Sequence, residues 1–158
     1  MVEIEGGASA MPLFAVLALT SALSAVSHEV ASCDGNTRQI EACLGERQAR
    51  NDANLAEYVA AARERIRRVA AETPSGASTV QNAAAGFDAA EAAWSQYRDA
   101  ACKAVYDYYL GGTIRGIKFL KCRMIMTQEH THTVWSDWLR YEDSSPPILP
   151  EPPPATFP

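Results

Sequence analysis

The stretch Trp94-Ser95-Gln96-Tyr97-Arg98-Asp99-Ala100-Ala101-Cys102, followed by Gly111-Gly112 and then Cys122, decides the fold of this chain. The two cysteines lie at nearly equal distances before and after the glycines. Because each residue of an α-helix rises about 1.5 Å, a reversal at the glycines brings both sulfur atoms to the same level. A disulfide requires Cα atoms within roughly 7 Å, so we predict a helical hairpin closed by Cys102–Cys122.

The cysteine count extends this prediction to the rest of the chain. There are four cysteines, an even number that fits two bridges in an oxidising compartment but permits three connectivities. With Cys102–Cys122 placed by its level positions, Cys33–Cys43 follows by elimination. Both bridges indicate an exported protein, because disulfides persist mainly outside the cytosol.

Length and charge narrow the class of protein. A chain of 158 residues is about one domain long. Its formal net charge of -5 argues against a nucleic-acid binder, which needs a basic surface to neutralise phosphates. We therefore expect no nucleic-acid partner.

The first 32 residues resemble an export segment. Residues 12–27 form an apolar, uncharged stretch. The length of this stretch suits a signal-peptide core and is short for a membrane span of about 20 residues. Residues 1–10 carry two glutamates and no basic residue, which is unusual for a signal, and translation from Met11 would remove them. We expect residues 1–32 to be a signal-like segment and the mature protein to be periplasmic or secreted.

A second interpretation of the same region is a lipid anchor. Val30-Ala31-Ser32-Cys33 has the form of a bacterial lipoprotein processing box, in which the cysteine is acylated after cleavage. Acylation of Cys33 would leave three cysteines and one odd thiol. Membrane contact is thus expected only through the signal segment or through lipid at Cys33.

Three long helices account for residues 33–143. Apolar residues follow a helical period from Thr37 to about Glu72, and a third helical pattern follows the glycines, where Thr113 can act as its cap. Between them, a seam of seven residues has heptad spacing: Phe87, Ala90, Trp94, Tyr97, Ala101, Ala104 and Tyr108. Short connections make the second helix antiparallel to its neighbours. The predicted fold is all-α, an antiparallel three-helix bundle stapled by two disulfides.

The last fifteen residues differ in composition. Residues 144–158 are rich in proline, which cannot donate a backbone hydrogen bond. We expect a Pro-rich tail that is extended or disordered.

Catalytic and metal chemistry find little support. Glu129-His130-Thr131-His132 is the single cluster that suggests a metal, and a di-iron bundle enzyme would need a second Glu-x-x-His pair. None exists, so a surface polar turn is the simpler interpretation. The sequence also lacks a Gly-x-Ser-x-Gly elbow and a phosphate-binding loop. We expect no enzyme, no catalytic residue, no metal and no cofactor.

Arg98 and Asp99 admit two interpretations. In the structural one, which we favour, Arg98 caps carbonyls at the turn or pairs with a carboxylate of the first helix such as Glu41 or Glu46. In the functional one, the pinned end of the hairpin binds a partner, since Arg and aromatic residues are common interface anchors. The candidate binding residues are Arg98, Asp99, Tyr108, Tyr109, Gly111 and Gly112.

Residues 33–140 resemble the LprI-type lysozyme inhibitor family. The matching features are Cys33, Cys43 in a long helix, Asn51-Asp52-Ala53-Asn54-Leu55 with Tyr58, Ala93 through Cys102, Gly111-Gly112 and Cys122. The chain departs from the pattern after the last cysteine, where Thr127-Gln128-Glu129-His130 replaces an expected Thr-x-x-Arg.

The resemblance implies an exported helical protein that protects the cell wall by binding lysozyme without catalysis. Host lysozymes are generally basic, so a negatively charged inhibitor gains from electrostatic steering. The alternative, from another class, is a structural or assembly module of the cell envelope that binds another envelope protein and has no activity toward lysozyme.

Overall fold

The computed structural model describes residues 32–72 and 77–156. They form three helices, α1 (Thr37–Glu72), α2 (Ala77–Tyr108) and α3 (Arg115–Val134), followed by a π-helical turn, η2 (Trp135–Leu139). None of the described residues forms a β-strand. The predicted all-α fold with three helices is confirmed, whereas the signal-like segment lies, apart from Ser32, outside the described residues.

Within these residues, no helix combines the length and the apolar character that crossing a bilayer requires.

Helix α1 begins where the sequence predicts, with a reciprocal cap. The Gln39 backbone N–H donates to Asn36 Oδ1 at 3.2 Å, and the Asn36 N–H donates to Gln39 Oε1 at 3.0 Å. This capping box satisfies two backbone donors that a helix start otherwise leaves unpaired. The helix therefore has a defined first turn.

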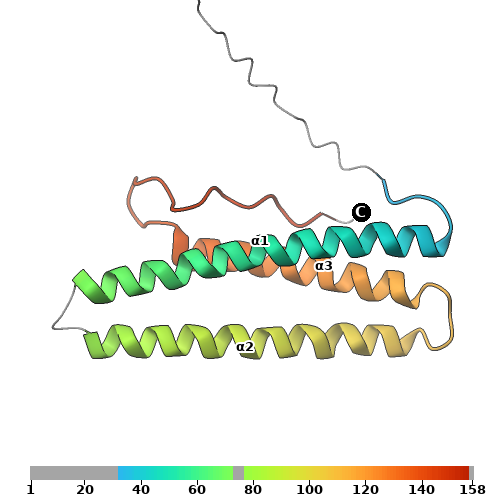
Figure 1. Ribbon diagram of the computed structural model, residues 1–158, viewed down its shortest axis with the longest axis horizontal. Helices are drawn as coiled ribbons and strands as arrows, with labels where there is room; N and C mark the ends of the chain where they lie inside the picture. The colour runs from blue at the N-terminus through green and yellow to red at the C-terminus, as the bar shows by residue number, and fades with distance from the viewer. Residues whose placement is uncertain (1–31, 73–76, 157–158) are drawn as a thin grey trace, which may run out of the picture. The chain divides into compact units, whose positions relative to one another are not determined.

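The three helices lie side by side (Figure 1), and their ion pairs give the direction of each. Between α1 and α2, Asp52 pairs with Arg98 and Arg63 pairs with Asp88. Residue numbers rise along one helix while they fall along the other, so α2 runs opposite to α1. The contacts between α2 and α3 show the same reversal.

Both predicted disulfides are confirmed. Cys33–Cys43 joins the segment before α1 to its second turn with Cα atoms 5.7 Å apart, and Cys102–Cys122 joins α2 to α3 with Cα atoms 5.6 Å apart. All four cysteines are thus paired, which indicates an oxidising compartment. The Cys33 sulfur is used in this bridge and is not available for the thioether that a lipid anchor requires.

The main apolar core lies at the end of the bundle away from the α2–α3 turn. Its buried members are Leu55, Tyr58, Val59, Ala62, Ile66, Phe87, Val134, Trp135 and Leu139. Trp138 packs edge-on against Phe87, with ring centroids 5.0 Å apart. All three helices contribute to this cluster, so its burial holds them together.

The predicted seam of α2 is partly wrong. Four of its seven residues are exposed: Ala90, Tyr97, Ala104 and Tyr108. Besides Trp94, which belongs to the predicted seam, the inner side of the helix carries Glu91, Arg98 and Cys102. A search for apolar residues could not find this face, because two of its four members are charged residues that are paired across the bundle.

Of the two predictions for the C-terminal segment, the extended one holds for residues 144–156, which contact the helices. Tyr58 Oη donates to the Pro150 carbonyl at 2.8 Å, and Trp135 Nε1 donates to the Leu149 carbonyl at 3.0 Å. Pro152 is buried as well. Prolines lack N–H groups but keep their carbonyls, and the helices supply side-chain donors for these. The segment consequently packs back along the bundle (Figure 1).

Candidate functional site

The structure divides the six candidate binding residues between two places. Arg98 and Asp99 lie in the middle of α2, whereas Tyr108, Tyr109, Gly111 and Gly112 lie at or just beyond its end. Ten residues separate Arg98 from Tyr108, which corresponds to about 15 Å along a helix. The six residues therefore do not form one continuous site.

Arg98 joins all three helices. Its side chain is only 9% exposed, and Nη1 donates to Asp52 Oδ1 at 2.9 Å and to Thr127 Oγ1 at 3.1 Å. Asp52 belongs to α1 and Thr127 to α3. The first-helix carboxylate that pairs with Arg98 is therefore Asp52 rather than Glu41 or Glu46.

Further polar side chains surround this contact. Gln48 Nε2 donates to Asp52 Oδ1 at 2.8 Å and to Thr127 Oγ1 at 3.2 Å. Arg123 Nη1 donates to Asp99 Oδ1 at 2.9 Å, and Arg98 Nε donates to the same atom at 3.3 Å. We call this group the central polar cluster; its members are Gln48, Asp52, Arg98, Asp99, Arg123 and Thr127.

The central polar cluster is balanced in charge, with two guanidinium groups and two carboxylates. A buried charge is tolerated only when it is paired and hydrogen-bonded, and here the partners come from different helices. The cluster thus sets the register of α1, α2 and α3 against one another. Asp52 and Arg98, which lie far apart in sequence, therefore meet in the folded bundle.

An aromatic stack continues from the central polar cluster along the α2–α3 contact. The Arg98 guanidinium lies over the Trp94 ring at 5.0 Å from its centroid, and the His130 ring stacks on Trp94 at 3.8 Å. His130 Nε2 is 3.0 Å from Glu91 Oε1. His132, by contrast, contacts Glu151 of the C-terminal segment at 3.2 Å. The two histidines therefore serve different contacts, and in the described part of the chain no three His, Cys, Asp or Glu side chains are grouped to hold a metal.

The α2–α3 turn has an unexpected backbone conformation. Leu110 has a φ of 43°, and among the described residues only it and Gly35 have positive φ. Glycine is usual at such a position after a helix, yet Gly111 and Gly112 do not adopt it. Gly112 is needed for space, because a Cβ there would lie 3.0 Å from the Tyr109 carbonyl oxygen. The left-handed residue of the turn is consequently a leucine.

The expected Thr113 cap is wrong. Helix α3 begins at Arg115 with Ile114 at the cap position, and no side chain caps it. The Arg115 N–H instead donates to the Gly112 carbonyl at 3.3 Å. A hydroxyl at the right place in a sequence caps a helix only if the backbone enters at its position, and here the turn extends one residue further.

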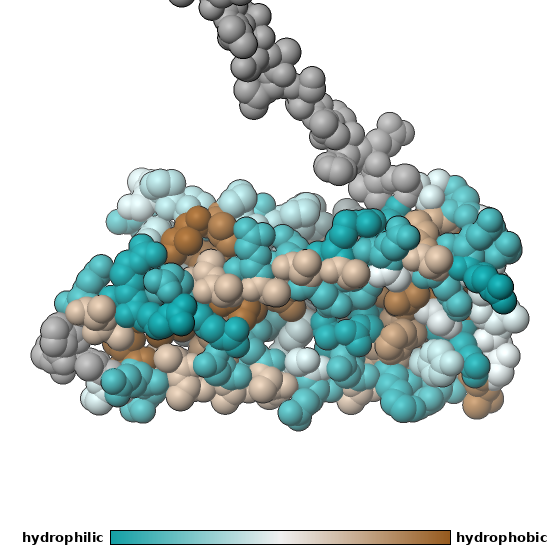
Figure 2. Space-filling view, viewed as in Figure 1, coloured by the Kyte–Doolittle hydropathy of each residue, from teal (hydrophilic) through white to brown (hydrophobic). Residues whose placement is uncertain are grey.

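Three large apolar side chains are exposed to solvent at this turn. Tyr108 is 80% exposed, Leu110 is 77% exposed and Ile114 is 43% exposed. The described residues hold five exposed large hydrophobic side chains, so three of the five lie within one short turn. Figure 2 shows hydrophobic surface among hydrophilic residues at the end of the bundle where α2 joins α3 in Figure 1. We call Tyr108, Leu110 and Ile114 the turn-end patch.

Cations border the turn-end patch. Arg115 Nη1 donates to the Leu110 carbonyl at 3.2 Å, and its guanidinium lies over the Tyr106 ring at 4.8 Å. Lys118 Nζ lies over the Tyr109 ring at 5.6 Å. Among the described residues, no carboxylate forms an ion pair with Arg115 or Lys118. These two side chains keep their charge available beside the exposed apolar groups.

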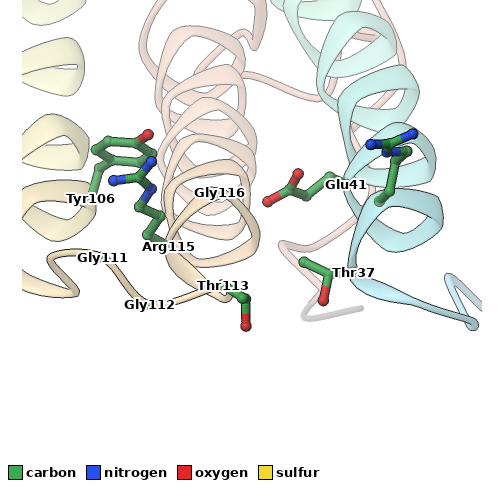
Figure 3. A pocket seen from close by; sticks show the side chains of 9 residues that line it. Thr37, Glu41, Tyr106, Gly111, Gly112, Thr113, Arg115 and Gly116 are labelled. Atoms are coloured by element: carbon green, nitrogen blue, oxygen red, sulfur yellow. The ribbon is translucent and has the colours of Figure 1, made fainter.

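An open cavity of about 530 Å³ lies between the start of α1, the turn and the start of α3. It is lined by Thr37, Arg38, Glu41, Tyr106, Gly111, Gly112, Thr113, Arg115 and Gly116. Figure 3 shows the Glu41 side chain directed from α1 toward Gly116 of α3, where any Cβ would collide with its carboxylate. The residues that line the cavity thus include one carboxylate, two guanidinium groups and three hydroxyls, a set suited to recognition of a polar group.

Sequence reasoning missed several of these residues. Asp52 and Thr127 were inside the family pattern, but nothing in the sequence indicated that they meet Arg98. Leu110 and Ile114 carried no signal, because a leucine after two tyrosines suggests a buried helix face. Arg115 and Lys118 were missed because isolated cations usually mark a solvated surface.

Comparisons with known proteins identify a family for this chain but no individual relative. No curated protein and no solved structure matches the chain. A family model described as lysozyme inhibitor LprI matches residues 29–133, which span α1, α2 and almost all of α3. The chain therefore belongs to the LprI family of lysozyme inhibitors.

Proposed function

We propose that this protein is an exported, non-enzymatic binding protein that inhibits lysozyme and so protects the bacterial cell wall. The observation that carries the proposal is the match of residues 29–133 to the lysozyme inhibitor LprI family. The same residues contain both disulfides, the central polar cluster and the turn-end patch. An inhibitor of this kind acts by recognition and needs a rigid surface more than a reactive group.

The compartment supports the proposal. Lysozyme attacks the cell wall from outside the cytoplasm, and an inhibitor must fold and persist there. Two disulfides, at Cys33–Cys43 and Cys102–Cys122, favour a periplasmic or secreted protein.

The distribution of chemistry favours binding over turnover. The charged side chains in the middle of the bundle pair with one another and join helices. At the turn, aromatic, aliphatic and guanidinium side chains are exposed together, and Tyr and Arg are enriched among residues that dominate binding energy at interfaces. We place the partner-binding surface at this end, with Tyr108, Tyr109, Gly111 and Gly112, and assign Arg98 and Asp99 the structural role of holding it in place.

The test is an inhibition assay with the disulfide-intact protein purified from an oxidising compartment. Lysozyme is titrated with the protein, and the clearing rate of a cell-wall suspension is followed. We expect the rate to fall with dose and to level off once the inhibitor saturates the enzyme. An equal amount of the protein after reduction and unfolding is the control.

A second readout separates binding from destruction of lysozyme. After incubation, the mixture is dissociated, and lysozyme is recovered, weighed by intact mass and assayed again. Full recovery of mass and activity supports a non-enzymatic inhibitor, whereas shortened or modified lysozyme would contradict it. No slowing of clearance at a tenfold molar excess would reject the inhibitor proposal and leave the envelope assembly module in its place.

A further inference from the structure

We infer that the turn-end patch enters the sugar-binding cleft of lysozyme, where Tyr108 and Leu110 make apolar contacts and Arg115 and Lys118 face the catalytic carboxyl groups of the enzyme. This inference rests on the proposed function and specifies the surface and mode of inhibition. It is carried by three independent features of the turn: its backbone, its exposure and its charges.

The backbone feature is the conformation of Leu110. A non-glycine residue at φ 43° brings its Cβ close to the following carbonyl oxygen, a cost that glycine does not have. Leu110 is 77% exposed, so its contacts within the chain offset little of this conformational free energy. Strained backbone positions cluster at functional sites. The value of this side chain therefore lies in a contact outside the chain.

The exposure feature is the projection of the patch beyond a stapled hairpin. Tyr108, Leu110 and Ile114 all lie within the turn that Cys102–Cys122 closes. Tyr109, half-buried, packs edge-on against Tyr108 with ring centroids 5.4 Å apart. A surface that is already ordered loses less entropy on binding. The turn can consequently fill a concave site on a partner without first becoming ordered.

The charge feature identifies what that concave site contains. Arg115 and Lys118 border the patch, and no carboxylate of the described residues forms an ion pair with either. Lysozyme is basic as a whole, but its cleft holds two carboxyl groups that act on the glycosidic bond. Cations entering that cleft meet opposite charge in a place from which water is partly excluded, where the attraction is stronger than at an open surface.

A second copy of this chain is a poorer occupant of the same patch. Two turn ends meeting face to face would bring Arg115 and Lys118 of one copy toward those of the other. Like charges across an interface disfavour it. The charges therefore select a partner whose concave surface is acidic.

The test combines inhibition kinetics with variants. A soluble oligosaccharide substrate is used to measure the inhibition constant at several substrate concentrations, and competitive inhibition is expected because inhibitor and sugar would share the cleft. Leu110→Gly removes the side chain and relieves the backbone, so it should fold at least as well as the parent, as checked by thermal unfolding. We expect it to raise the inhibition constant by about tenfold or more, the size of a hot-spot loss.

The charge arm uses Arg115→Gln with Lys118→Gln in one chain. We expect an inhibition constant raised about tenfold at low salt and a weaker dependence on salt than in the parent. Matched controls lie away from the turn: Val69→Ala for an exposed apolar residue of α1, and Arg67→Gln for an exposed cation of the same helix. Both controls should inhibit within about twofold of the parent.

The outcomes separate the two proposals. If the parent inhibits competitively and the turn variants fail while the controls do not, the inference holds. If the parent inhibits but Leu110→Gly inhibits equally well, or inhibition is not competitive with the sugar, the inference is overturned and the proposed function stands. If the parent does not inhibit at all, the proposed function fails, and the inference falls with it.

Discussion

The two ends of this bundle are held together by different forces. At the end where the C-terminal segment packs back, nine buried residues of the apolar core join the helices. Toward the turn, fewer apolar side chains are buried, Leu44 and Met124 among them, and a disulfide and the central polar cluster also join the helices. At the turn itself, Tyr108, Leu110 and Ile114 stay exposed. An end that is closed covalently does not need to bury its apolar residues, so it is free to present them to a partner.

The contrast also concerns residues of the sequence pattern by which the chain resembles the LprI family. Asp52, Arg98 and Cys102 all lie between the apolar core and the turn. A disulfide that closes a loop of this size contributes roughly 2–4 kcal/mol in chain-entropy models. Together with buried hydrogen bonds, it adds to the smaller hydrophobic burial in this part of the bundle.

The strongest test of the contrast compares two leucines. Leu139 is fully buried in the apolar core, and Leu139→Ala should lower the free energy of unfolding by about 3–4 kcal/mol, because it removes buried methyl groups and leaves a cavity. Leu110→Ala, at the exposed turn, should change it by less than about 1 kcal/mol. Urea denaturation measures both. Equal losses in the two variants would mean that the turn end is packed like the core.

A second test addresses the central polar cluster. Arg98→Ala removes the buried guanidinium that donates to both Asp52 and Thr127 and leaves Gln48 as their shared donor. It should cost about 2–4 kcal/mol, toward the lower part of the range for a buried pair because Asp52 is partly exposed. Lys103→Ala is the matched control, since Lys103 forms an exposed pair with Asp107 on the same helix. Its cost should stay below about 0.5 kcal/mol. Similar midpoints of thermal unfolding for the two variants would show that the cluster does not hold the helices.

The smallest effect concerns the attachment of the C-terminal segment. Tyr58→Phe removes the hydrogen bond to the Pro150 carbonyl and should cost about 1 kcal/mol at neutral pH. Burial raises the pKa of the Tyr58 phenol above its ordinary value of 10.0, and the nearby Glu57 carboxylate raises it further.

The raised pKa gives this contribution a pH dependence. A folded-state pKa above the unfolded value means that the stabilisation is fully present below about pH 10 and is lost as the pH rises through the folded-state pKa. The difference in unfolding free energy between the parent and Tyr58→Phe should therefore shrink in alkaline buffer. Urea denaturation of both chains at pH 7 and above pH 10 measures it, and a constant difference would contradict this role of the hydroxyl.

Several features could be predicted from local patterns. The bounds of α1 at Thr37 and Glu72 follow from helical periodicity and from the sequence Thr73-Pro74-Ser75-Gly76, because the residue before a proline disfavours the helical conformation. The Cys102–Cys122 bridge follows from the constant rise of a helix on either side of a turn. The partner of Arg98 could not be predicted in the same way, because Asp52 lies forty-six residues away and other carboxylates of the same helix were equally plausible.

By itself, the sequence determined that the chain forms three helices and that a turn at the glycines brings two cysteine sulfur atoms together. Its even number of cysteines also indicated disulfides, which fit an oxidising compartment. These follow from interactions over a few residues and from the regular geometry of a helix. Only the tertiary structure decided that Arg98 faces inward to Asp52 and Thr127, that the proline-rich segment packs on Tyr58 and Trp135, and that Leu110 rather than a glycine takes the left-handed position. Each of these depends on which groups the folded bundle brings together, and no spacing along the chain contains that information.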